Sequence, residues 1–215
     1  MDETSLHMTT IPARPHDQDS QAQITPSDAI AMLRAGNRRF LEGAPLERNW
    51  ANDVSATAHG QYPYAVVLGC IDSRVPVETV FDQGIGDIFT PRVAGNIVNE
   101  DLLGSMEFAC KLAGSKAILV LGHTSCGAVK GAIGKARLGN LTALVTKIEP
   151  VVDRVAENMD RESPDFVDAV AEANVEATIE AIRSQSEVLA EMEQAGEIAI
   201  VGGMYDVSNG AVRFL

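Results

Sequence analysis

Short apolar runs alternate with longer amphipathic stretches along most of this chain. Four of the runs have the length and residue types of buried strands: 64–69, 88–91, 117–122 and 198–201. The stretches around them predict helices near 76–82, near 100–113, from about 126, near 140–159 and near 164–195. Strands separated by helices predict an α/β fold, with a mostly parallel β-sheet flanked by helices.

Cap and turn residues add an N-terminal helical arm and a C-terminal hairpin. The Thr-Pro-Ser-Asp sequence at 25–28 combines a cap residue, a proline at the first helical position and an acidic first turn, and Gly43 ends the predicted helix. Residues 44–63 are predicted to form a loop and a short helix around Trp50. Near the end of the chain, Ser-Asn-Gly at 208–210 is typical of a hairpin turn.

The first 23 residues differ from the rest of the chain. They are polar, contain prolines and show no periodicity, so a flexible N-terminal tail (1–23) is expected before a single domain over 24–215. The alternative is an arm that docks on the domain. Two of the histidines, His7 and His16, lie in this segment and are expected to face solvent.

Charge and hydropathy exclude some classes of partner. The formal net charge is −13, which argues against nucleic acid and anionic membranes as partners. No apolar run approaches the ~20 residues that span a bilayer, and the N-terminal residues lack the charged-then-apolar pattern of a secretory signal. We therefore expect a cytoplasmic protein.

Two cysteines and a histidine directly follow two of the predicted strands. Cys70 comes after 64–69, and His123 and Cys126 come after 117–122. The carboxyl ends of strands line the ligand site in open α/β sheets, so these side chains are expected to converge. Two thiolates and one imidazole, with a fourth position left for water, are typical of a catalytic zinc. The helix that starts at Cys126 is expected to favour its thiolate.

Asp72 and Arg74 lie two residues apart, immediately after the first cysteine. On an extended turn, both side chains can point the same way. Asp72 can then take the fourth position on zinc, or it can pair with Arg74 and accept a hydrogen bond from the zinc-bound water. An unrelated surface ion pair is the alternative. Cys110, by contrast, lies on a predicted helix, where core packing is the expected role.

Four motifs in this chain resemble those of the β-class carbonic anhydrases. They are Cys70 to Pro76, Gly86 to Phe89, Arg92 to Asn96 and Gly122 to Ala128. The resemblance runs from about residue 26 to 205 and implies zinc bound by Cys70, His123 and Cys126. It also implies that Asp72 is a fourth ligand in a closed state and pairs with Arg74 in an open state.

The same resemblance implies further residues on the substrate side of the pocket. Gln61 matches the family's substrate-side glutamine, and Phe89 matches an apolar wall that the neighbouring subunit often supplies. The backbone N–H of Gly127 would face bound bicarbonate. Because the family's pocket is usually built at a subunit boundary, a homodimer or a higher homo-oligomer is expected.

The activity implied is the zinc-dependent, reversible hydration of CO₂ to bicarbonate and a proton. One alternative is hydrolysis of carbonyl sulfide or carbon disulfide, which the same fold is known to host. Another is a non-catalytic protein whose structural zinc is closed by Asp72. Arg74 weighs against the structural site, because such a site needs no group to draw the fourth ligand away.

Some β-class members bind inhibitory bicarbonate beside the metal and lock the site closed. They resemble one another in a tryptophan three residues before the first cysteine ligand, where this chain has Val67. Arg92 matches their pocket arginine, but valine lacks the indole N–H that would help enclose an anion. We therefore predict an open resting site at neutral pH, with Asp72 paired with Arg74.

Overall fold

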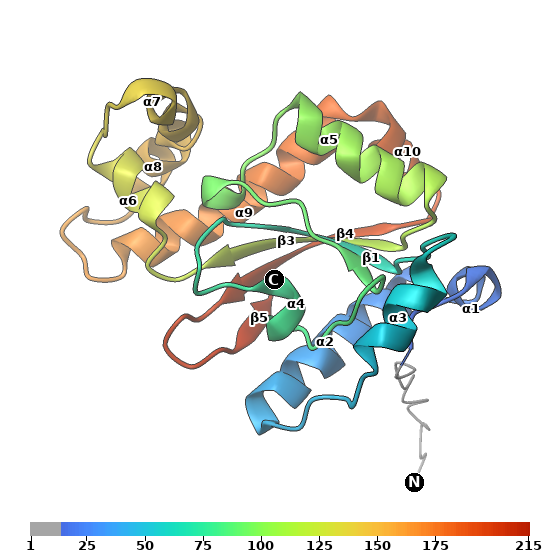
Figure 1. Ribbon diagram of the computed structural model, residues 1–215. Coiled ribbons are helices and arrows are strands. Elements are labelled where there is room, and N and C mark those ends of the chain that lie inside the picture. The colour runs from blue at the N-terminus through green and yellow to red at the C-terminus, as the bar shows by residue number, and fades with distance from the viewer. Residues whose placement is uncertain (1–13) are drawn as a thin grey trace, which may run out of the picture.

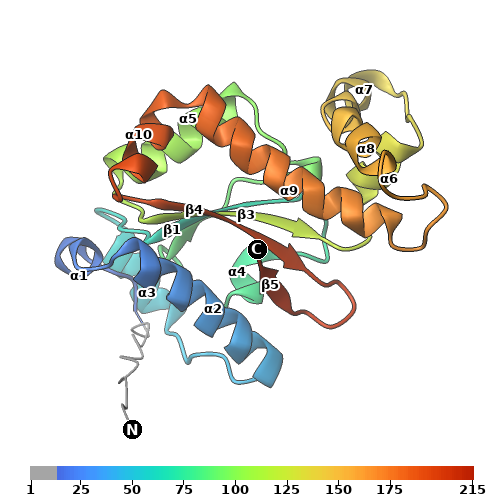
Figure 2. The same cartoon turned by 180° about the vertical axis from the view of Figure 1, so that it is seen from behind.

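The computed structural model describes residues 14–215, which form a central β-sheet between two layers of helices (Figures 1 and 2). The sheet has five strands in the order β2-β1-β3-β4-β5. The first four are parallel, and β5 runs antiparallel to β4. The strands are β1 (Ala65–Gly69), β2 (Ile88–Phe89), β3 (Ala117–His123), β4 (Ala199–Tyr205) and β5 (Val212–Phe214). The α/β fold with a mostly parallel sheet is confirmed.

The apolar runs form the central strands because helices cover both faces of the sheet. Every residue of β1 and β3 is buried, which explains why these strands read as continuous apolar runs. β2 is shorter than the predicted 88–91. Pro91 has no N–H to donate to the ladder, and past it only a single bridge joins Arg92 to Gly69.

One face of the sheet packs against the N-terminal half of the chain. α2 (Pro26–Glu42) and α4 (Val77–Val80) cover this face, while α1 (Gln18–Ala22) and α3 (Trp50–Thr57) lie near the amino ends of the strands (Figure 1). Met32 and Leu33 of α2 are fully buried there with Leu119 of β3. The predicted start and end of α2 are confirmed: Thr25 caps it and Gly43 ends it at a φ of 64°.

The helices between β2 and β4 cover the other face and the carboxyl ends of the strands. The predicted helices 100–113, 140–159 and 164–195 are each divided in two. Ser186, for example, ends one helix and caps the next. The elements are η1 (Ala94–Asn96), α5 (Glu100–Glu107), the π-helical turn η2 (Phe108–Leu112), α6 (Gly127–Ile133), α7 (Gly139–Thr146), α8 (Glu149–Ala156), α9 (Phe166–Gln185) and α10 (Glu187–Gln194).

The prediction of a flexible tail over residues 1–23 is wrong for its last part. Helix α1 is docked: the Gln21 side-chain amide donates to the carbonyl oxygens of Pro63 and Ala113, at 2.8 Å each. His16 is buried rather than exposed, and its ring meets Tyr64 edge-on. Residues 1–13, His7 among them, lie outside the described residues. Residues 14–23 therefore form an arm that docks on the domain, which was the alternative expectation.

The strand order reverses within the sheet, at the carboxyl ends of two neighbouring strands. From β1 the chain moves outward to β2, whereas from β3 it moves outward on the other side to β4. Ligands of open α/β sheets bind where the strand order reverses in this way, outside the carboxyl ends of the strands. Here that point lies between β1 and β3. Cys70 directly follows β1, whereas β3 ends at His123 and is followed by Cys126.

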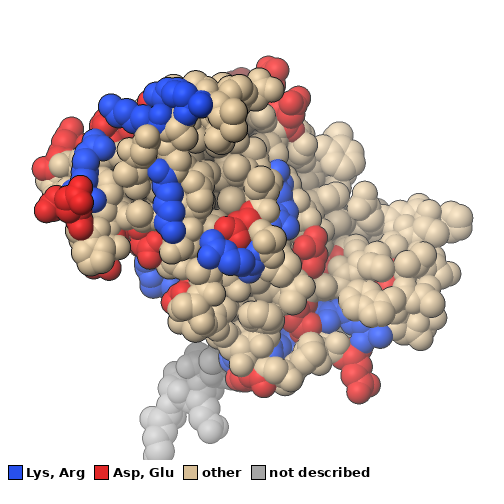
Figure 3. Space-filling model, turned by 60° about the vertical axis from the view of Figure 1, so that its left-hand side comes forward, with Lys and Arg blue, Asp and Glu red and all other residues tan. Residues whose placement is uncertain are grey.

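Two surface properties of the described residues concern possible partners: the distribution of charge, and the length and hydropathy of the helices. On the side where α6 to α8 come forward, basic and acidic side chains are interspersed (Figure 3). No described helix is both long and apolar enough to span a bilayer.

Candidate metal centre

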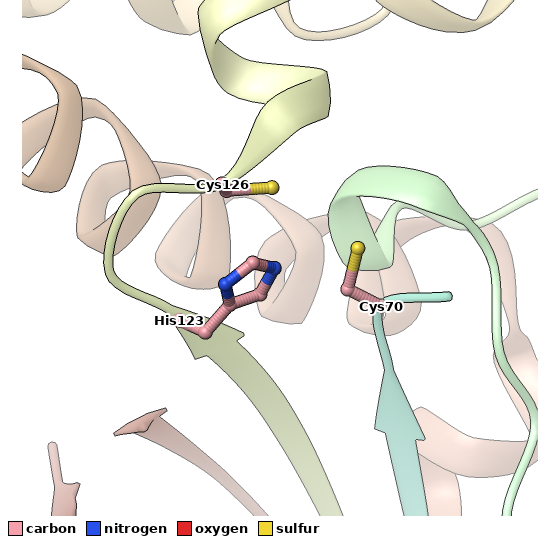
Figure 4. A group of neighbouring side chains, drawn as sticks. All are labelled: Cys70, His123 and Cys126. Carbon is pink, nitrogen blue, oxygen red and sulfur yellow. The ribbon is translucent and has the colours of Figure 1, made fainter. Parts of the chain in front are cut away.

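Three buried donor groups converge where the strand order reverses (Figure 4). Cys70 follows β1, His123 ends β3 and Cys126 immediately precedes α6. One ligand atom from each side chain lies within 4.8 Å of the other two. The predicted convergence of these residues is confirmed, and the two sulfur atoms and one imidazole nitrogen are the donor types that zinc takes in proteins.

The orientation of His123 also fits a metal. The side chain is fully buried, and Nδ1 lies 2.9 Å from the carbonyl oxygen of Thr124. With Nδ1 as the donor of that hydrogen bond, Nε2 carries the free lone pair. Nε2 has no hydrogen-bond partner among the described residues. A buried nitrogen with a free lone pair beside two sulfur atoms is suited to bind a metal ion.

The two thiols differ in how readily they lose a proton. A hydrogen bond from Cys126 lowers the pKa of Cys70, and the backbone N–H of Gly95 donates to the same sulfur at 3.3 Å. The same interaction, together with burial, raises the pKa of Cys126. The backbone N–H groups of Val129 and Ala128, at the start of α6, act in the opposite direction and lower the pKa of Cys126, which is the expected effect of the helix on this thiol.

Asp72 and Arg74 form a two-point ion pair beside these donors. The Arg74 guanidinium donates to both Asp72 carboxylate oxygens, from Nε at 3.0 Å and from Nη2 at 2.8 Å. The backbone N–H of Arg74 adds a third hydrogen bond at 2.9 Å. These hydrogen bonds hold the pKa of Asp72 well below its usual range. The carboxylate therefore faces Arg74, as predicted for the open state.

Arg92 donates hydrogen bonds to the backbone of the turn that follows β1. Its Nε donates to the carbonyl oxygen of Cys70 and its Nη2 to that of Asp72, both at 2.7 Å. Val67 is fully buried within β1. Arg92 thus fixes the turn that carries Cys70 and Asp72, and its hydrogen bonds are directed to carbonyl groups of the chain.

Helix α9 supplies two contacts that the sequence patterns did not predict. Asn174 Nδ2 donates to the carbonyl oxygen of Gly95 at 2.8 Å, and Asp168 Oδ1 accepts a hydrogen bond from the N–H of Ser125 at 2.7 Å. A signal for Asn174 was available. It is a polar residue on the buried face of α9, next to Val175.

Two of the predicted substrate residues lie away from the metal ligands of their own chain. Gln61 is exposed in the loop before β1, so the length of that strand, ~16 Å, separates it from Cys70. Phe89 pairs with Val66 near the start of β1 and stacks edge-on against Phe108. Gly127 alone of the three adjoins a metal ligand, as the exposed first residue of α6.

Cys110 is a core residue, as predicted. It is 2% exposed in the cluster between the sheet and α5, and burial raises the pKa of its thiol to about 12. It is not part of the group formed by the other two cysteines.

A parallel sheet with a Cys, His, Cys cluster at its switch point and an adjacent Asp–Arg pair defines a β-class carbonic anhydrase site. The comparisons agree: a family model described as carbonic anhydrase matches residues 65–212. Carbonic anhydrase 2 of Mycobacterium tuberculosis is 38% identical over 189 residues, which cover 86% of this chain and 90% of that protein. The carbonic anhydrase of Mycolicibacterium smegmatis is 36% identical and covers 87% and 92%. The chain belongs to the β-class carbonic anhydrase family.

Solved structures agree with this assignment. The β-carbonic anhydrase CafA of Aspergillus fumigatus superposes with a TM-score of 0.69 at 28% identity, over 88% of this chain and 89% of that one. A Coccomyxa β-carbonic anhydrase in complex with acetazolamide gives a TM-score of 0.70 at 27% identity, over 84% and 83%.

Proposed function

We propose that this chain catalyses the reversible hydration of CO₂ to bicarbonate and a proton, and that zinc held by Cys70, His123 and Cys126 is required. The observation that carries the proposal is the position of the Asp72–Arg74 pair, directly beside three convergent donors. A zinc ion in that position would supply the Lewis acidity that lets water lose a proton near neutral pH.

Asp72 is the group that orients the reacting water. Because its pKa is held low by Arg74, it stays a carboxylate at neutral pH and can only accept hydrogen bonds. Its Oδ2 lies 3.9 Å from His123 Nε2, close to where the donors converge. A water between these groups would donate one hydrogen to Asp72 and direct a lone pair toward CO₂.

Arg74 keeps Asp72 in that role. The guanidinium fork binds both carboxylate oxygens, and Nη2 also reaches the carbonyl oxygen of Ser125 at 3.3 Å. This contact ties the turn after β1 to the turn after β3. Held in this way, Asp72 is kept from becoming a fourth metal ligand that would displace the water.

The substrate side of the pocket is completed by the backbone and by a second subunit. The N–H of Gly127, the first residue of α6, would face the bicarbonate oxygens. Gln61 and Phe89 are proposed to serve the partner's site, because each lies far from the metal ligands of its own chain. Phe89 and Phe108 line a surface hollow of about 590 Å³ that a partner could cover.

The proposal of a homo-oligomer has support from exposed apolar residues and from a relative. Phe108 is 49% exposed and Leu112 is 76% exposed, both on the η2 turn beside that hollow. Two β-carbonic anhydrases of Sordaria macrospora, one of which superposes on this chain with a TM-score of 0.66, are tetrameric. We propose a dimer as the smallest active unit.

A CO₂ hydration assay on the purified protein, after chelation and after zinc is restored, tests the function. We expect activity to be lost on chelation and to return with zinc. Cys126→Ser should lose most of the metal and the activity, whereas the matched variant Cys110→Ser should keep both. Full zinc occupancy in Cys126→Ser would contradict the ligand assignment, and a zinc-loaded wild-type protein without activity would favour a structural metal. A parallel assay with carbonyl sulfide separates the remaining alternative.

A further inference from the structure

One helix contacts the loops of both cysteine ligands. From α9, Asn174 donates to the carbonyl oxygen of Gly95, and Gly95 in turn donates its N–H to Cys70 Sγ. Also from α9, Asp168 accepts the N–H of Ser125, the residue next to Cys126. The two metal loops follow different strands, so α9 is a shared support for ligands that lie far apart in the sequence.

Both supported peptides have unusual backbone conformations. Gly95 has a φ of 72° and Ser125 a φ of 55°, in the left-handed region that non-glycine residues rarely occupy. A Cβ atom at Gly95 would also come within 2.7 Å of Cδ1 of Ile148, the residue before α8 (Glu149–Ala156), so a larger residue at this position would require that side chain to move. Conformations of this kind persist when surrounding contacts determine them, and Asn174 and Asp168 supply such contacts.

We propose that Asn174 and Asp168 are positioning residues for the metal site, which hold the Cys70 and Cys126 loops in the geometry that binds zinc. This inference rests on the proposed zinc-dependent function. Asn174 is 2% exposed, and its amide N–H₂ is aimed at the Gly95 carbonyl rather than at solvent. Packing of the hydrophobic core alone does not explain an asparagine at this buried position, because an apolar side chain would be buried there at a lower cost in free energy.

The contact at Gly95 also bears on the chemistry of the sulfur. A hydrogen bond from an N–H to a thiolate draws charge away from the metal ligand. A site with two thiolates donates more charge to zinc than an all-histidine site does, so this hydrogen bond offsets part of that effect. Asn174 holds the carbonyl that follows the Gly95 Cα, and the N–H that precedes the same Cα donates to Cys70, so fixing the backbone at Gly95 helps to maintain the hydrogen bond to Cys70.

Two isosteric substitutions test the proposal, because the two residues need opposite chemistry. Asn174 must donate and Asp168 must accept. Asn174→Asp keeps the shape but removes the donor, so zinc affinity should fall roughly 10–100-fold. Asp168→Asn keeps an acceptor oxygen, so its zinc affinity should stay close to that of the wild type. Asp168→Leu removes the acceptor and should weaken zinc binding as Asn174→Asp does.

Zinc affinity is measured by competition with a chelating dye, and the cobalt-substituted proteins supply a spectroscopic readout. The thiolate-to-cobalt charge-transfer band should change in Asn174→Asp and stay unchanged in Asp168→Asn. Thr178→Val is the matched control. It removes a buried hydroxyl one turn further along α9, and among the described residues no hydrogen bond joins that hydroxyl to either cysteine loop, so it should leave the affinity and the spectrum unchanged.

The outcomes separate this inference from the proposed function. A wild-type protein that binds no zinc overturns both. A wild-type protein that binds zinc, with Asn174→Asp and Asp168→Leu binding it equally well, overturns only the role of α9. If Asn174→Asp fails to fold, the cadmium-113 form of the wild-type protein decides. The Gly95 amide proton should couple to the metal through Cys70 Sγ, and the absence of that coupling overturns the proposal.

Discussion

Asp72 is held by three hydrogen bonds from Arg74, so its position depends on that one partner. Arg74→Ala removes the two guanidinium hydrogen bonds and leaves only the one from the backbone N–H, so the carboxylate can turn toward the metal and exclude water. We expect zinc to stay bound while CO₂ hydration falls roughly 10–100-fold. Arg137→Ala is the control, because it removes a comparable exposed pair with Glu149, away from the metal ligands.

Asp72→Asn tests the same pair by removing the charge of the carboxylate and leaving the arginine unchanged. The variant should retain zinc, because the three proposed ligands are unchanged. Its amide has one acceptor oxygen and no charge, so the reacting water should lose its orienting carboxylate. Wild-type turnover in either Arg74→Ala or Asp72→Asn, measured by stopped-flow hydration, would show that the pair has no catalytic role.

Asp87 is a buried carboxyl away from this pair, and it gives stability a pH dependence. Burial raises its pKa, and Oδ1 has no hydrogen-bond partner among the described residues, while Oδ2 accepts the N–H of Gly84 at 2.6 Å. Above the unfolded-state pKa of about 3.9, the unfolded chain releases this proton more readily than the folded one. Asp87 therefore lowers stability as the pH rises, until its own raised pKa is passed.

Asp87→Asn removes this titration. Relative to the variant, the wild type should lose up to about 1.4 kcal/mol of unfolding free energy per pH unit within that window. Urea unfolding of both proteins at a series of pH values from 4 upward measures the difference. Parallel pH profiles for the two proteins would mean that Asp87 ionises in the folded state as easily as in the unfolded chain.

The convergence of Cys70, His123 and Cys126 could be predicted from the sequence, because few cysteines and histidines are present and these three lie at the ends of strands that a parallel sheet aligns. The Asp72–Arg74 pair could be predicted because the two residues are neighbours in the chain. The contacts from Asn174 and Asp168 could not. They depend on how α9 lies across the sheet, and the polar pattern of a helix does not specify which loop it will meet.

Among the helices, local signals determined how well each was predicted. α2 has a cap, a first-turn proline and a closing glycine, and its bounds agree with the structure. The division of the long C-terminal stretch at Ser186 and the π-helical turn after α5 were not predicted, because in both places the apolar periodicity continues through the break. Helix α1 was missed for the opposite reason: its residues are polar, and tertiary contacts hold it in place.

Those contacts make the arm around α1 sensitive to acid. Burial lowers the pKa of His16, while neighbouring Asp17 acts in the opposite direction, and the ring lies against Tyr64. A released arm takes up a proton at the ordinary histidine pKa of about 6.5, so docking is favoured above that pH and weakens below it. The protection factors of residues 17–22, which compare each amide exchange rate with its intrinsic rate, should therefore fall as the pH falls from 7.5 to 5.5.

His16→Leu should keep the arm docked across that range, since leucine fills the site without a charge. His59→Leu is the control, because His59 is exposed and should leave the pH dependence as it is. Exchange that responds equally to pH in His16→Leu and in the wild type, after correction for the intrinsic rate, would contradict a role for His16.

For the assembled protein, the exposed apolar side chains of η2 predict how a single substitution should change the oligomeric state. Leu112→Asp places a charge on a side chain that is 76% exposed in the single chain, so the fold should be unaffected. If that surface meets a second copy, the charge should produce monomers that keep zinc but lose hydration activity. Light scattering, zinc content and activity test the three parts. Leu138→Asp, at a side chain 72% exposed elsewhere, should change none of them.

The separation of Gln61 from Cys70 along β1 has a consequence for inheritance. If each subunit lends Gln61 to its neighbour and binds the metal for itself, a Gln61 defect silences the neighbour's site and a Cys126 defect silences its own. Two such alleles in one cell would then rescue each other, because about half of the randomly paired dimers carry one intact site. Two alleles of the same kind would not. The remaining activity would thus depend on the number of intact composite sites and not on the number of undamaged subunits.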